Sequence, residues 1–151
     1  MHVRYYRDQD FNSLSQIEQK AFGEGAYSNY MLKMMLKSPG GFTMVVEDNS
    51  VLYGYATMEK LSPISVDIES IAVIPEQHGH GLGSLLIKAM EIEAKKRGYE
   101  DVVLEVREKN TGAIDFYKNH GYSIFGDTLY NYYTISYNGS RNAYRMKKTL
   151  Q

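Results

Sequence analysis

Three glycines at alternate positions are the strongest chemical signal in this sequence. Gly79 and Gly81 follow an apolar segment at 71–74, and Gly83 is the second residue of a stretch that starts at Leu82 with the periodicity of an amphipathic helix. Glycine lets backbone N–H groups approach a ligand closely, and the first turn of a helix adds the positive end of its dipole. We therefore expect this turn to bind an anion, such as a phosphate group.

A carboxylate and a phenol follow further along the chain. Glu105 interrupts an apolar run at the end of an expected strand, and Tyr117 lies on the short helix that comes next. Partial burial would raise the pKa of Glu105 toward the range of a general base, and a phenol can donate a proton or a hydrogen bond to a leaving group. Each residue also has a structural interpretation, a surface ion pair for the glutamate and core packing for the tyrosine.

These segments together resemble the acyl-CoA site of the GNAT superfamily, and within it the N-terminal acetyltransferases of the RimI type and of the NatA catalytic subunit, including archaeal forms. The resemblance covers nearly the whole chain and is densest from about 70 to 146. It implies acetyl-CoA as co-substrate and direct acetyl transfer to an amine, with Glu105 as base, through a water, and Tyr117 as acid. The positions it implies for the coenzyme are Ile71, Ala72, Val73, His78, Gly79, His80, Gly81, Leu82, Gly83, Ser84, Asn110 and Tyr117.

The sequence differs from the family signature at one position, and the family offers alternative residues for the base. His78 stands where the family signature usually has glutamine or arginine, so Gln77 is a second candidate for that side-chain contact. Asp67 and Glu69 are reserve bases, since other branches of the family place a glutamate on this strand. The backbone near Val73 is the oxyanion donor that the resemblance implies.

The acceptor side of the resemblance consists mainly of tyrosines. Residues 131–133 and 142–146 are similar to the peptide-facing hairpin of the N-terminal acetyltransferases, and residues 22–27 to the opposite wall. The substrate contacts implied are Glu24, Tyr27, Tyr132 and Tyr133. The alternative is the ordinary preference of tyrosine for half-exposed strands.

Amine chemistry favours an N-terminus as acceptor. Deprotonating an α-amine of pKa 7.7–8.0 at pH 7 costs about 1 kcal/mol, and a lysine of pKa near 10.4 costs about 3.5 kcal/mol more. We therefore predict transfer to protein or peptide N-termini. An auxiliary subunit or association with the ribosome is compatible with this prediction. An internal lysine or small amine is the alternative acceptor, and a non-catalytic acyl-CoA-sensing module is the alternative of a different class.

Other interpretations of the glycine turn are weaker. A Walker A loop needs a lysine before Ser84, and the dinucleotide fingerprint Gly-x-Gly-x-x-Gly lacks its third glycine. A turn without ligand stays open, because short glycine patterns are weak in isolation. His78 and His80 have no cysteine or third ligand nearby, so no metal is expected.

Two periodicities predict the elements that position these residues. Helical spacing of apolar residues covers about 11–22, 29–36, 82–97 and 113–120. Strands are expected at about 3–6, 42–47, 51–61, 65–73, 102–106, 122–125, 130–137 and 142–147, with a hairpin turn at Asn138-Gly139. The two-residue period places Asp67, Glu69, Ile71 and Val73 on one face. The fold class is α/β (α+β), a GNAT fold with a mixed central sheet of about seven strands, one parallel crossover and about four helices.

Bulk composition limits the function classes. A length of 151 residues with 43% hydrophobic composition predicts one domain over 1–151. The net charge of -1 does not favour nucleic acid or an acidic membrane as partner. The absence of cysteine excludes a thiolate nucleophile, which favours direct transfer. With no apolar leader or spanning segment, we expect a cytoplasmic protein.

Overall fold

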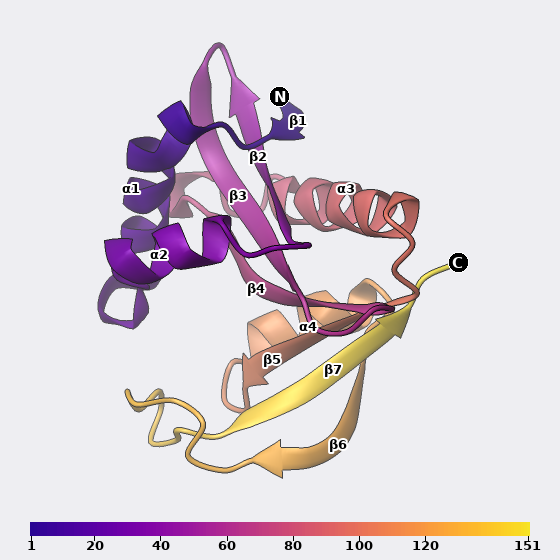
Figure 1. The fold of residues 1–151 in the computed structure, drawn as a ribbon. Helices are drawn as coiled ribbons and strands as arrows, with labels where there is room; N and C mark the ends of the chain where they lie inside the picture. The colour runs from indigo at the N-terminus through magenta and orange to yellow at the C-terminus, as the bar shows by residue number, and fades with distance from the viewer.

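A computed structural model describes residues 1–151 and contains one mixed sheet of seven strands (Figure 1). The strands are β1 (His2–Tyr5), β2 (Phe42–Asp48), β3 (Val51–Lys60), β4 (Ser65–Val73), β5 (Asp101–Arg107), β6 (Ser123–Leu129) and β7 (Ala143–Thr149). Their order in the sheet is β1-β2-β3-β4-β5-β7-β6, and only β4 and β5 pair in parallel. The predicted fold class is confirmed.

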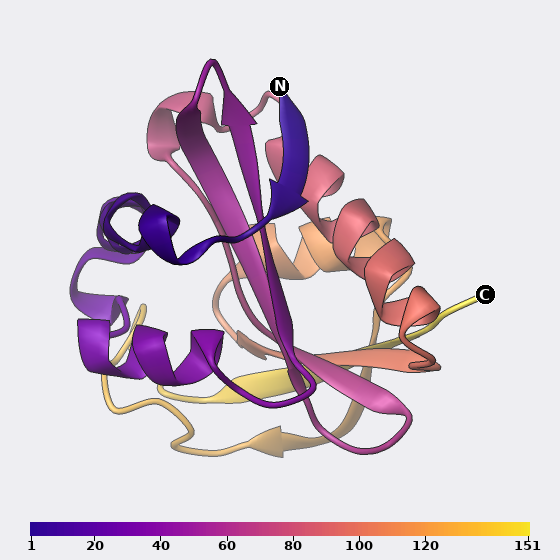
Figure 2. The ribbon, with the colours of Figure 1, turned by 45° about the horizontal axis from the view of Figure 1, so that its top comes forward.

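Four helices cover the two faces of the sheet (Figure 2). They are α1 (Phe11–Phe22), α2 (Asn29–Leu36), α3 (Leu82–Lys96) and α4 (Thr111–Asn119), with short 3-10 turns at Asp8–Asp10, Gly23–Gly25 and Pro75–Gln77. Helices α1 and α2 lie on one face, and α3 and α4 on the other. None of these helices combines the length and apolar character needed to cross a membrane.

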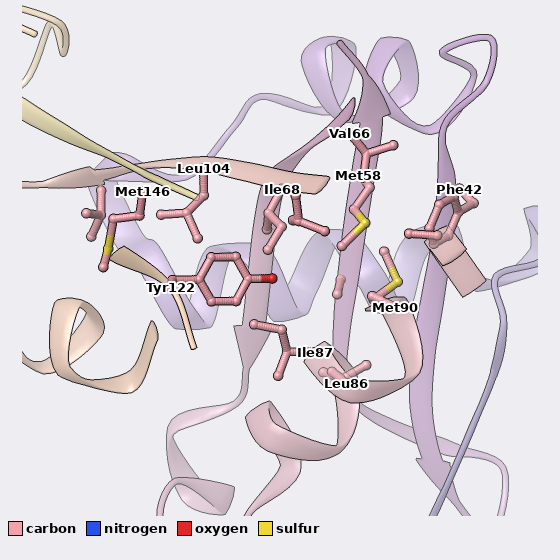
Figure 3. Close-up of a cluster of buried hydrophobic side chains, with 14 of the residues drawn as sticks. Phe42, Met58, Val66, Ile68, Leu86, Ile87, Met90, Leu104, Tyr122 and Met146 are labelled. Atoms are coloured by element: carbon pink, nitrogen blue, oxygen red, sulfur yellow. The ribbon is translucent and has the colours of Figure 1, made fainter. Parts of the chain in front are cut away.

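Each face has its own hydrophobic cluster. On one face, Met90 of α3 lies beside Met58 and Phe42 of the sheet (Figure 3), and Leu86 and Ile87 belong to the same buried cluster. On the other face, α1 and α2 pack against β2, β3 and β4 through a smaller cluster that includes Leu14, Ile17, Leu32, Met35, Val45, Tyr55 and Ala72. The sheet is therefore buried on both sides near its centre, as expected where a parallel pair is covered by a crossover helix.

Strands β4 and β5 separate before they end. Their paired register runs from Ser65↔Asp101 to Ile68↔Leu104, although β4 continues to Val73 and β5 to Arg107. Beyond this point β4 still pairs with β3, and β5 with β7. The split leaves one edge of β4 without a strand partner near the centre of the molecule, where a ligand can reach backbone groups.

A β-bulge in β4 corrects one prediction from the two-residue period. The register changes from Thr57↔Ser70 to Met58↔Ile68, so Glu69 has no partner on β3. Ser70 and Ala72 consequently face α1, while Ile71 and Val73 pack on the α3 side. Asp67 and Ile71 therefore lie on opposite faces, because the extra residue of a bulge reverses the alternation.

The predicted strand at 130–137 is not formed. The segment between β6 and β7 is irregular, and its only β-bridge joins Tyr137 and Ser140 around the expected turn. Asn131 has a φ of +53°, which interrupts an extended strand. Strand β6 instead continues to Leu129 and pairs with β7, and the irregular segment extends toward α2 (Figures 1 and 2).

Candidate active site

A cleft of about 530 Å³ lies where α3 begins, beside the end of β4 and one side of α4. Of the residues expected to bind the coenzyme, nine line it: Ile71, Val73, His78, Gly79, Gly81, Leu82, Gly83, Ser84 and Tyr117. Gln77, Gly112, Ala113 and Phe116 complete the lining. The glycine turn and the phenol, which are distant in sequence, thus share one cavity.

The glycine turn leaves the first turn of α3 open to an anion. Gly81 is the residue before the helix and has a φ of +79°, and no side chain caps the N–H groups that follow it. Gly79 has a φ of +83°. Both conformations are costly for other residues. The N–H groups of Leu82, Gly83 and Ser84 therefore lack intrahelical acceptors, and they fit the phosphate groups of a coenzyme.

Gly83 also brings α3 and α4 together. A Cβ at this position would lie 3.2 Å and 3.3 Å from two ring carbons of Phe116. Phe116 in turn packs edge-on against Tyr117, with ring centroids 5.3 Å apart. The close approach of the two helices thus sets the place of the phenol in the cleft.

The remaining residues expected at the coenzyme have other surroundings. Ala72 is buried against α1 and α2, so only its backbone is near the split of the sheet. Asn110 caps α4 by accepting a hydrogen bond from the Ala113 N–H at 3.1 Å. The Nε2 atom of His78 lies 2.9 Å from the Val73 carbonyl oxygen, and His80 is exposed outside the cleft lining.

Three carboxyl groups gather on the opposite face of the sheet. Asp67 lies within hydrogen-bonding reach of Glu105 and Glu69.

 Only 7% of the Asp67 surface is exposed, and one of its oxygens, Oδ1, has no hydrogen-bond partner. Burial raises the pKa of Asp67, and Glu105 and Glu69 raise it further. Burial also raises the pKa of Glu69, followed by the charges of Glu59 and Glu105. The two reserve bases, Asp67 and Glu69, and the first candidate base, Glu105, therefore form one carboxyl cluster.

Tyrosines surround this cluster of three carboxyl groups on the side expected to bind the acceptor. The Tyr27 hydroxyl donates a hydrogen bond of 3.5 Å to the Glu69 carbonyl oxygen. The charges of Asp67, Glu69 and Glu105 act on both Tyr132 and Tyr133, whose rings pack edge-on with centroids 4.9 Å apart. The Arg107 guanidinium stacks on the Tyr133 ring at 3.9 Å. The irregular segment before β7 thus places two tyrosines over the carboxylates.

Tyr133 also connects the two halves of the site. Burial raises the pKa of Tyr133 to about 12, and the nearby carboxylates act in the same direction. Burial raises the pKa of Tyr117 as well, with a smaller contribution from Tyr133. One tyrosine therefore lies close enough to influence both the Tyr117 phenol in the cleft and the Glu105 carboxylate.

Glu18 is an important residue that sequence reasoning missed. It is 1% exposed on α1, and its carboxylate accepts hydrogen bonds from the Tyr55 hydroxyl at 2.5 Å and the Tyr27 N–H at 2.9 Å. A longer contact of 3.4 Å comes from the Ser70 hydroxyl, next to the bulge. The only sequence signal was an acidic residue on the apolar stripe of a helix between Ile17 and Ala21.

Glu24, which was expected to contact the substrate, lies apart from the carboxyl cluster. It is exposed in the 3-10 turn Gly23–Gly25, and no hydrogen bond or ion pair connects it to the three clustered carboxyl groups. No group of three or more histidine, aspartate or glutamate side chains has an arrangement that could hold a metal ion.

Comparison with known proteins identifies the family. The profile described as "Acetyltransferase (GNAT) family" matches residues 9–122. The chain belongs to the GNAT acetyltransferase family. The predicted family and enzyme class, an N-acetyltransferase, are therefore confirmed, and GNAT acetyltransferases use acetyl-CoA.

Several relatives of this GNAT acetyltransferase have similar sequences or folds. It is 27% identical over 132 residues to N-alpha-acetyltransferase 30 of Schizosaccharomyces pombe, covering 85% of this chain and 87% of the relative. It is 28% identical over 138 residues to the ribosomal protein bS18-alanine N-acetyltransferase of Haemophilus influenzae, covering 89% and 88%. The crystal structure of Ard1 from Thermoplasma volcanium superposes with a TM-score of 0.87 and 28% identity, covering 99% of this chain and 97% of that one.

Proposed function

We propose that this enzyme transfers the acetyl group of acetyl-CoA directly to the α-amine of a protein or peptide N-terminus. The observation that carries the proposal is the split between β4 and β5 beyond Ile68 and Leu104. At this split, the open first turn of α3 and the cleft lie on one face of the sheet. The cluster of carboxyl groups and its tyrosines lie on the other face. A thioester reaching through the split would meet an amine from the opposite side. The names of the relatives, which include N-terminal acetyltransferases, agree with this acceptor.

The residues have distinct roles in the proposed transfer. Glu105, through a water molecule, takes a proton from the acceptor ammonium and leaves the nitrogen lone pair free. The nitrogen forms a bond to the acetyl carbonyl carbon, the carbon–sulfur bond breaks to release the thiolate, and the nitrogen gives up its extra proton to solvent to leave the neutral amide. Backbone N–H groups at the free edge of β4, near Val73, would stabilise the negative charge on the carbonyl oxygen.

Tyr117 stabilises the leaving group mainly as a hydrogen-bond donor. Burial raises the pKa of its phenol above the usual value of about 10, whereas a thiol has a pKa of about 8.5. Full proton transfer from the phenol to the thiolate is therefore unfavourable, and a hydrogen bond to the sulfur is the favoured interaction. The thiolate can take its proton from solvent after release.

The test is thiol release from acetyl-CoA with a peptide that carries both a free N-terminus and an internal lysine. Blocking the N-terminus is expected to abolish release, while replacing the lysine leaves it unchanged. The opposite pattern would identify a lysine acetyltransferase. Acetyl-CoA binding with no thiol release for any amine would identify the non-catalytic sensing module. Because two relatives are named for the alanine N-terminus of ribosomal protein bS18, a peptide that begins with alanine is a suitable first substrate.

Two variants test the roles of the side chains. Glu105→Gln is expected to lower turnover by about 10²- to 10⁴-fold, and Tyr117→Phe by about 10- to 100-fold. Binding of acetyl-CoA, measured by calorimetry, should change little in both. Glu100→Gln and Tyr99→Phe are matched controls, because Glu100 is exposed before β5 and the Tyr99 hydroxyl bonds the Gly40 carbonyl away from the site. Unchanged turnover in Glu105→Gln and Tyr117→Phe would contradict the assignment.

A further inference from the structure

We propose that Asp67 is a carboxylic acid that keeps its proton throughout the reaction and donates it in a hydrogen bond to Glu105. In this role Asp67 is a positioning residue, which orients the base without adding a negative charge to the acceptor pocket. The inference rests on the proposed function, because it assumes that Glu105 is the base. It concerns a residue that the proposed reaction otherwise leaves without a role.

The neighbours of Asp67 on the sheet are carboxylates. On β3 the residue opposite is Glu59, on β4 itself Glu69 is close, and on β5 Glu105 lies within hydrogen-bonding reach. The other titratable groups near the cluster are the hydroxyls of Tyr27, Tyr132 and Tyr133, the Glu18 carboxylate with its Tyr55 partner on the α1 side, and the Arg107 guanidinium beyond the Tyr133 ring. The charged groups that act most strongly on Asp67 itself are the carboxylates of Glu105 and Glu69.

The nearest strand cations are occupied elsewhere. Arg107, on β5 with Glu105, stacks on the Tyr133 ring at 3.9 Å and donates a hydrogen bond of 2.7 Å to the Ile135 carbonyl oxygen. Arg145 on β7 is opposite Glu105 in register but stacks on the Phe125 ring at 4.9 Å. Lys147 is opposite Val103 and pairs with Asp101 at 3.7 Å. None of the ion pairs in the structure includes Asp67, Glu69 or Glu105. No cation compensates the charge that an ionised Asp67 would have.

The Asp67 side chain is also buried. Asp67 is 7% exposed, and its buried Oδ1 has no hydrogen-bond partner among the protein groups, so bulk solvent does not screen an ionised carboxylate here. An unpaired buried carboxylate beside other carboxylates is strongly unfavourable, and protonation of the most buried member relieves both the desolvation and the repulsion. A protonated Asp67 also becomes a donor, and an ionised Glu105 is the acceptor that it can reach. The same proton thus removes the repulsion and fixes the base.

Asp67→Asn and Asp67→Ala separate this role from that of an ionised carboxylate. Asparagine has the shape of the protonated acid and presents an N–H donor to Glu105, so kcat and the acid limb of the pH profile of kcat/KM should stay close to those of the wild type. Alanine lacks the donor, and we expect kcat to fall about tenfold and the acid limb to move about one unit toward higher pH. If Asp67 were ionised, the asparagine variant would lose a charge, so its acid limb would move to lower pH; that result would overturn the proposal.

A direct measurement keeps the proposal independent of activity and of the folding of the variants. The carboxyl carbon of Asp67 in the ¹³C-labelled wild-type protein, assigned by its absence in Asp67→Asn, should show the chemical shift of a protonated acid from pH 5 to pH 8. A titration near pH 4 would refute the proposal. If Glu105→Gln proved fully active, the assignment of the base would fail, whereas the NMR result would still report on the Asp67 proton.

Discussion

The buried carboxylate of Glu18 offers a quantitative test of how the acceptor wall is held in place. It joins α1 to β3 through the Tyr55 hydroxyl and to the 26–28 loop through the Tyr27 N–H. Both Glu18 and Tyr55 are almost completely buried, so neither can exchange its lost partner for water. We therefore expect the two residues to be energetically coupled.

The expected free energies follow from these contacts. Tyr55→Phe removes a hydrogen bond to a charged group, which costs about 1.5–3 kcal/mol of unfolding free energy. In Glu18→Gln the new amide NH2 group must face one of the two groups that already donate to this side chain, the Tyr55 hydroxyl or the Tyr27 N–H. Losing one of these hydrogen bonds lowers the free energy of unfolding by about 1–3 kcal/mol. In the double variant the amide oxygen can accept from the Tyr27 N–H, the Tyr55 hydroxyl no longer opposes the amide nitrogen, and the Ser70 hydroxyl can turn to accept from it. The double variant should therefore lose about 1–2 kcal/mol less than the sum of the single variants.

The assay is equilibrium urea unfolding followed by circular dichroism, since the chain has no tryptophan. Each kcal/mol corresponds to a shift of about 2–4 °C in Tm for a chain of this size. A second readout is kinetic: Glu18→Gln should raise the KM for the peptide more than the KM for acetyl-CoA, because Tyr27 lies on the acceptor side. Additive free energies within about 0.5 kcal/mol would refute the coupling, and equal changes in both KM values would refute the link to the acceptor wall.

Three further predictions concern the helix starts and the carboxyl cluster. A Cβ at Gly112 would meet only the Asn110 Oδ1 atom, at an ordinary contact distance of 3.9 Å, so Gly112→Ala should stabilise the free protein by up to about 1 kcal/mol. Gly83→Ala meets the Phe116 ring and should gain no stability and weaken acetyl-CoA binding. Thermal unfolding and calorimetry distinguish the two variants, and equal stabilisation would contradict the close packing at Gly83. Asn110→Ala removes the cap of α4 and should lower the unfolding free energy by about 0.5–2 kcal/mol, which urea unfolding can measure; no loss would mean that the cap contributes little. The pKa of Asp67 is raised in the folded state, so its favourable contribution is complete below the unfolded pKa of about 3.9 and is lost as pH rises. Urea unfolding at pH 4, 6 and 8 should thus show the wild type losing stability relative to Asp67→Asn, by at most about 1.4 kcal/mol per pH unit; a constant difference would contradict the raised pKa.

Local signals predicted the part of the fold around the coenzyme cleft well. Helix α3 begins at Leu82, directly after Gly81, and ends at Lys96, before Gly98, because the turn residues and the apolar stripe agree on its limits. Strand β5 follows from an uninterrupted apolar run that is buried on both faces. Here local preference and tertiary packing favour the same structure.

The acceptor side depends on contacts that local patterns do not contain. Tyrosine-rich residues 130–137 have high strand propensity, yet the positive φ of Asn131 and the pairing of β6 directly with β7 leave them irregular. Glu18 has an ordinary helical environment in the sequence, and its partners Tyr55 and Ser70 are 37 and 52 residues away. Strand propensity could indicate where tyrosines are abundant, but not that they would form a wall over carboxylates.

The bulge at Glu69 explains why the carboxyl group could not be assembled from periodicity. With regular alternation, Asp67, Glu69, Ile71 and Val73 would share one face, and the acids would lie beside the cleft instead of across the sheet from it. The extra residue lets Asp67 and Ser70 face α1 while Ile71 and Val73 line the cleft. A single inserted residue in β4 therefore separates the donor side from the acceptor side. Because β4 and β5 diverge just beyond Ile68, the two sides remain connected at the point where bond exchange is proposed.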